Sequence, residues 1–252
     1  MYYFRIRNVL SNRWLWCGWG VLLFLLFRTI WPHFVIAPIA PEYDMLTVIS
    51  IPLSLSAVSP FAAVFCSLPV SSIFPIEYEE GFTKSVLLRT NKKKYIMGII
   101  FETITVGSLA ITIPYVILFC FAAMKAGPSC PETLSEYYRN TIWFDMALSH
   151  GGYLVLIGKS LLAALFGCVW SMLGLIASVI FLNRYIGAIA PFILYQTLWS
   201  VFTASKYNPV YLLNGNGTLW KSIGEIVAIQ LAICVVLVVI TDRLIRWRCR
   251  DV

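Results

Sequence analysis

The sequence predicts an all-α polytopic membrane protein, and three observations support this fold class. The 252 residues are 60% hydrophobic and only 12% charged, which is about half the charged share of soluble proteins. The apolar residues form long continuous runs, whereas an outer-membrane barrel would alternate apolar and polar positions. The connections between the runs are short, which leaves little room for a soluble domain. We therefore treat 1–252 as a single transmembrane domain.

Six apolar segments are near or above the ~20 residues that a helix needs to cross a bilayer. They run over 14–31, 47–73, 96–124, 152–182, 185–204 and 223–240. Three prolines interrupt the second segment, and Pro114 predicts a kink in the third. We expect the basic and aromatic stretch 1–13 to be an interfacial amphipathic segment. A further short amphipathic helix is predicted over 131–145.

The distribution of Lys and Arg predicts the orientation. With the N-terminus inside, the inside segments hold 13 of the 19 Lys and Arg residues and the outside loops hold four. Because inside connections are enriched in these residues, both termini and the connection 74–95 are predicted to be cytosolic. We expect the basic tail 242–250 to anchor the last span and to contact anionic lipid heads. The net charge of +7 therefore reflects topology, and nucleic-acid binding is not expected.

The connection 74–95 concentrates charge between two apolar spans. Its ionisable residues are Glu77, Glu79, Glu80, Lys84, Arg89, Lys92, Lys93 and Lys94. The Glu residues lie near the start of a potential helix and 92–94 near its end, which complements the helix dipole. Phe82, Val86 and Leu87 are spaced to form one apolar face that a groove could accept. A solvated loop that only follows the positive-inside rule would explain the basic run, but not the acidic cluster with an apolar face.

The chain shows no pattern for catalysis, for a resident cofactor or for a metal site. It has no phosphate-binding loop of the Gly-x-x-x-x-Gly-Lys-Ser/Thr type, and its two His and seven Cys lack metal-ligand spacing. Glu102 and Lys159 fall within predicted spans, where charge is costly and tends to be paired or to face a cavity. Glu102 is therefore the candidate for a translocation path, and an interfacial position is the alternative for both residues.

The connection 74–95 and its setting resemble the permease subunits of ABC-2 type transporters. In that family the loop between the second and third spans carries an acidic residue and Gly, then an apolar helical stretch, then basic residues. The matching residues are Glu77 or Glu80, Gly81, Val86, Leu87, Leu88, Arg89 and 92–94. The sequence departs from the commonest pattern at Thr90-Asn91, where a Pro often follows the Leu run. The length, the six predicted spans and the missing nucleotide site fit the same family.

The resemblance implies a transport subunit that is not itself an enzyme. Two such permeases, identical or different, would form the path and bind two cytosolic ABC ATPase subunits, which carry ATP and Mg²⁺. A short coupling helix in the loop would dock on the ATPase. The implied coupling residues are Glu77, Glu80, Gly81, Phe82, Val86, Leu87 and Arg89.

The small size and the short outer loops suit a bacterial plasma-membrane exporter of an antimicrobial peptide, a lipid-like molecule or a drug. The alternative function is a secondary transporter, or a membrane subunit that does not transport and has no ATPase partner. An intramembrane enzyme is the least favoured class, because the chain lacks the His and nucleophile motifs that such chemistry needs.

Overall fold

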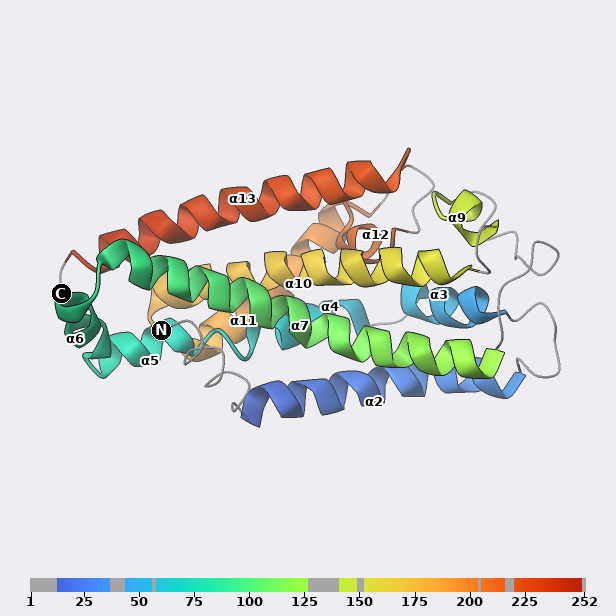
Figure 1. Cartoon of the computed structure of the whole chain (residues 1–252), viewed down its shortest axis with the longest axis horizontal. Helices are drawn as coiled ribbons and strands as arrows, with labels where there is room; N and C mark the ends of the chain where they lie inside the picture. Colours follow the sequence, from blue (N-terminus) through green and yellow to red (C-terminus); the bar gives the residue numbers. More distant parts are fainter. Residues whose placement is uncertain are drawn as a thin grey trace.

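The computed structural model describes residues 13–36, 44–55, 58–126, 141–148, 152–203, 205–215 and 220–250, and every regular element within these ranges is a helix (Figure 1). The helices are α2 (Arg13–Ile36), α3 (Met45–Leu55), α4 (Val58–Ser67), α5 (Ile73–Glu79), α6 (Phe82–Arg89), α7 (Lys92–Ala126), α9 (Phe144–Leu148), α10 (Tyr153–Phe181), α11 (Arg184–Val201), α12 (Pro209–Asn214) and α13 (Ile223–Arg248). In the described part of the chain, α2, α7, α10 and α13 are long and apolar enough to cross a membrane.

The four long helices run along the longest axis of the molecule, and α10 lies among its neighbours (Figure 1). Helix α10 packs against α7, α11, α13 and α4. The short helices α5 and α6 lie at one end, together with the start of α7 and the last turns of α13 (Figure 1). Helices α3 and α9 lie toward the opposite end. The charged connection is thus placed at one tip of an elongated helical body.

Four of the predicted apolar segments form long helices close to the expected positions. Helix α10 coincides with 152–182 almost residue for residue. Helix α7 begins earlier than 96–124 because Asn91 caps it, with the Asn91 side-chain oxygen accepting the backbone N–H of Lys93 at 2.9 Å. Helix α13 is capped by Ser222 and continues to Arg248. Most of the basic tail is therefore part of the last helix and not an extension beyond it.

The second predicted span, 47–73, was expected to be interrupted by its prolines, and the structure divides it into separate short helices. These are α3 and α4, followed by hydrogen-bonded turns that lead to α5. Pro60 lies in the first turn of α4, where its missing N–H removes no helical hydrogen bond. Pro69 falls in the turns after α4. Neither α3 nor α4 reaches the ~20 residues that cross a bilayer.

Of the first and fifth predicted spans, the first forms a helix long and apolar enough to cross a membrane and the fifth does not. Segment 14–31 is helix α2, which extends to Ile36. Segment 185–204 is helix α11, but α11 is not among the helices long and apolar enough to span. Residues 1–12 of the amphipathic segment and residues 131–140 of the helix predicted at 131–145 lie outside the described residues. The short helix α12 was not predicted; Asn208 caps it by accepting the N–H of Val210 at 3.0 Å.

Glycines bring α10 into close contact with two neighbours. A Cβ atom added to Gly167 of α10 would lie 2.3 Å from the carbonyl oxygen of Gly107 in α7. A Cβ added to Gly174 of α10 would lie 2.9 Å from the carbonyl oxygen of Gly187 in α11. Small residues at helix crossings let membrane helices approach backbone to backbone. The position of α10 between α7 and α11 therefore depends on glycines, because any larger residue at these crossings would push the helices apart.

Candidate functional site

The charged connection folds into two helices joined at Gly81, and we call residues 73–90 the elbow. Helix α5 ends at Glu79 and helix α6 begins at Phe82. Between them Gly81 has a φ of 68°, in the left-handed region that glycine adopts without strain. The backbone therefore turns at the acidic residue and glycine that the sequence singled out.

The predicted match between the charges and a helix dipole is wrong. Glu77 and Glu79 lie in the last turn of α5, and α6 has no acidic residue in its first turn. The basic run 92–94 opens α7, and Arg89 is the basic residue in the last turn of α6. Two breaks in the potential helix are the cause: the left-handed turn at Gly81 leaves Glu77 and Glu79 at the end of α5, and the extended residue Thr90 puts 92–94 at the start of α7.

The predicted apolar face of Phe82, Val86 and Leu87 is divided between the inside and the outside of the molecule. Val86 and Leu87 pack against a buried apolar cluster of the chain itself. Phe82 is 48% exposed, and Leu88, which the spacing left out, is 82% exposed. Apolar residues occur on every side of α6, so periodicity could not select its outward face. The outward residues are Phe82, Leu88 and the exposed Arg89.

Three side chains fasten the elbow to α7. The Tyr95 hydroxyl donates to Glu77 Oε2 at 2.7 Å, and Thr83 Oγ1 lies 3.1 Å from the same hydroxyl. Because a hydroxyl has a single hydrogen, which Tyr95 gives to the carboxylate, Thr83 is the donor to Tyr95. Tyr95 and Thr83 are buried. Sequence reasoning missed both; the available signal was an aromatic hydroxyl directly after a basic run.

Two basic residues at this end cap the C-termini of α13 and α10. Lys92 Nζ donates to the carbonyl oxygens of Arg246 at 3.2 Å and Cys249 at 3.1 Å, at the end of α13. The Arg248 guanidinium donates to the carbonyl oxygen of Val179 at 3.2 Å, near the end of α10. The last carbonyls of a helix have no partner within it, and cationic side chains satisfy them. These bonds tie α7, α10 and α13 together beside the elbow.

A cleft opens where the elbow faces the turn between α10 and α11. One cavity of about 410 Å³ lies between α5 and this turn, with Glu79 and Glu80 on one side and Arg184 on the other. A second cavity of about 480 Å³ lies between α4 and α11 and shares Arg184 and Tyr185 with the first. The predicted coupling residue Glu80 therefore lines a cleft and does not lie on the outward face of α6.

The two candidate ionisable residues of the spans are both buried. Glu102 is 4% exposed in α7 and lines neither cavity beside the elbow. Lys159 is 3% exposed in α10, and its Nζ donates to the carbonyl oxygen of Asn214 at 3.1 Å. The same Nζ lies 5.3 Å from the ring centroid of Trp143. The Lys159 ammonium therefore caps the C-terminus of α12 and joins α12 to α10, which is a structural role.

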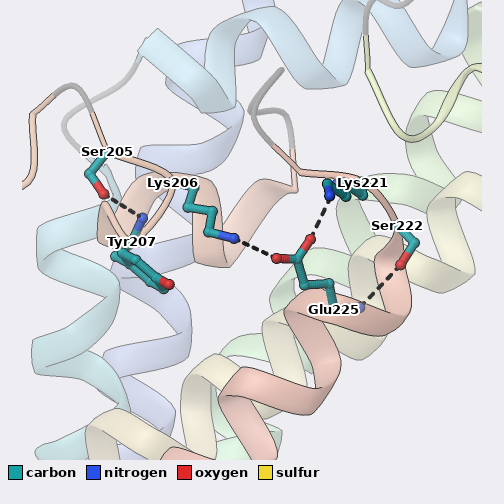
Figure 2. A network of polar contacts seen from close by, with 6 residues as sticks. All are labelled: Ser205, Lys206, Tyr207, Lys221, Ser222 and Glu225. Carbon is teal, nitrogen blue, oxygen red and sulfur yellow. Dashed lines mark hydrogen bonds and ion pairs between the residues drawn. The ribbon is translucent and has the colours of Figure 1, made fainter.

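A second polar cluster joins the α11–α12 connection to the start of α13 (Figure 2). Lys206 Nζ lies 2.5 Å from Glu225 Oε1, and Glu225 Oε2 accepts the backbone N–H of Lys221 at 3.3 Å. Lys206 also lies 5.5 and 5.3 Å from the ring centroids of Tyr207 and Trp220. The hydrogen bond with Glu225 raises the pKa of Lys206. The cluster holds the first turn of α13 in place.

Comparison of the chain with protein-family models, with curated proteins and with solved structures gave no match. Among the described residues, no group of three His, Cys, Asp or Glu side chains is placed to hold a metal ion. The functional assignment therefore depends on the elbow and on the helices that carry it.

Proposed function

We propose that this chain is the permease subunit of an ABC-2 type exporter and that the elbow is where its cytosolic ATPase docks. The outward face of α6 carries the proposal. Phe82 and Leu88 are large, exposed apolar side chains on a helix of eight residues at one tip of the molecule (Figure 1). Apolar anchors beside a cation suit a partner that receives a helix in a groove.

The charge distribution supports a cytosolic position for this tip. The basic run 92–94 and the last turns of α13 lie at the same end as α6 (Figure 1). Cytosolic connections are enriched in Lys and Arg. In this orientation the exposed face of α6 points into the compartment that holds ATP, and the chain lies in the plasma membrane of a bacterium.

The attachment of the elbow also supports a coupling role. A helix that transmits force must be held firmly to the spans that move. Val86 and Leu87 pack into the apolar cluster around α7, and Thr83 hydrogen-bonds with Tyr95. One face of α6 is therefore fixed to the membrane helices while the other remains open for a partner.

In this proposal, two permeases, identical or different, form the path for an amphipathic cargo such as an antimicrobial peptide, a lipid-like molecule or a drug. ATP and Mg²⁺ bind the partner ATPase.

A second candidate function is a secondary transporter, and the buried Glu102 favours it, because acidic groups inside membrane helices are costly and often functional.

The deciding experiment is purification of the tagged chain from its native membrane, with mass spectrometry of the proteins that remain bound. We expect a stoichiometric ATPase with a phosphate-binding loop. Leu88→Asp should weaken its binding by about tenfold or more, because exposed apolar anchors dominate such interfaces. Trp247→Asp is the matched control, because Trp247 is 51% exposed in the last turns of α13, at the same end of the molecule but outside the elbow. A wild-type chain that purifies alone and supports no ATP hydrolysis would favour the secondary transporter.

A further inference from the structure

Helix α6 has few polar connections to the rest of the chain. Within the described residues, Thr83 is the α6 side chain that hydrogen-bonds with another helix. The Ser85 hydroxyl bonds only within the elbow, to the carbonyl oxygen of Gly81 at 3.5 Å. Any movement imposed on α6 therefore reaches the long helices through the two-residue backbone link to α7, through apolar packing and through the contact between Thr83 and Tyr95.

Tyr95 links three helices at once. Its hydroxyl accepts from Thr83 of α6 and donates to Glu77 of α5, while its ring lies in the first turn of α7 with 0% exposure. The bond between Thr83 and Tyr95 is buried, where a hydrogen bond is stronger than in water and a polar group left without a partner is costly, while the bond to Glu77 is partly buried. The three side chains therefore resist separation, which holds α5, α6 and the start of α7 together.

The same turn of α7 is also bonded to α13. Lys92 lies three residues before Tyr95, on the same side of the helix, and donates to two carbonyl oxygens at the end of α13. A displacement of α6 that pulls on Tyr95 thus acts on a helix turn that is fixed to a second long helix.

We propose that the Tyr95 hydroxyl is a positioning group that makes α5, α6 and α7 move as one body when an ATPase pushes on α6. This inference rests on the proposed function and deepens it. The hydroxyl takes no part in docking, because it is buried on the side of α6 that faces the membrane helices. Its loss should leave the ATPase bound but reduce the transmission of its movement.

The test uses the complex of the full chain with its co-purified ATPase, reconstituted in liposomes. The measured quantities are ATPase bound per permease, and ATP hydrolysis by the complex relative to the ATPase alone. Tyr95→Phe keeps the ring and should leave binding unchanged, while the stimulation of hydrolysis falls by about tenfold. Tyr78→Phe is the matched control: its ring packs against the same apolar cluster, and among the described residues its hydroxyl forms no hydrogen bond.

A second pair of variants separates the hydroxyl from general packing. Thr83→Val should reproduce the loss, whereas Thr83→Ser keeps a donor and should restore stimulation. Wild-type stimulation in Tyr95→Phe with the ATPase bound would overturn this inference and leave the proposed function standing. Loss of ATPase binding in Tyr95→Phe would also overturn this inference, because the hydroxyl would then be needed only to keep the elbow folded for docking. A wild-type chain that binds no ATPase would overturn the proposed function itself.

Discussion

Replacement of Gly167 by alanine tests the close contact between α10 and α7. The added Cβ would lie 2.3 Å from the carbonyl oxygen of Gly107 and 3.0 Å from the Ile111 side chain. The oxygen belongs to a helix backbone and cannot rotate away. To reach even a 3.0 Å separation the helices must part by about 0.7 Å, in an interior that is packed as tightly as a crystal.

The expected cost follows from two opposing effects. Forcing a methyl group into a packed interface costs ~1–3 kcal/mol. Alanine favours a helix over glycine by ~1 kcal/mol, which offsets part of this cost. We therefore expect Gly167→Ala to lower the free energy of unfolding by about 1–2 kcal/mol. Gly107→Ala should cost less in the Gly167→Ala background than alone, because the helices have already separated.

The assay is unfolding of the purified chain in mixed micelles with increasing SDS, followed by tryptophan fluorescence. Gly20→Ala is the matched control, because a Cβ on Gly20 of α2 would meet no atom within 4 Å. It should leave the unfolding midpoint unchanged or raise it. Equal midpoints for Gly167→Ala and Gly20→Ala would refute the close-packing explanation.

Three further predictions concern the ends of the molecule. Gly81→Ala should destabilise the elbow by ~1–2 kcal/mol through its left-handed φ, with Gly81→Asn less harmful, as hydrogen exchange of α6 would show. Lys206→Met should change the fluorescence of Trp220 and lower stability at neutral pH. Because the hydrogen bond with Glu225 raises the Lys206 pKa, the wild-type advantage is present while both groups are charged; it is lost as the pH rises through the raised Lys206 pKa or falls far enough to protonate Glu225. Arg248→Ala should lower the thermal midpoint by removing bonds worth ~1 kcal/mol at the end of α10.

The candidate site shows how far sequence reasoning reached. Glu80 and Gly81 were singled out as coupling residues on one potential helix, whereas Gly81 adopts a left-handed turn that ends α5 before α6 begins. The sequence did not indicate which of the neighbouring residues in α6 face outward and which face the rest of the molecule. Val86 and Leu87 differ from Leu88 only in which side of a short helix faces the cluster around α7. A helix that is apolar on every side does not encode that choice in its own spacing.

The sequence by itself determined what depends on neighbours along the chain: the helical class, the position of α10 and the start of α13. Apolar run length and capping chemistry act over a few residues, so they can be read without the fold. Only the tertiary structure decided that Gly167 meets Gly107 and that Tyr95 joins Thr83 to Glu77. These contacts link separate helices, and their energies depend on how whole helices pack, which no local pattern specifies.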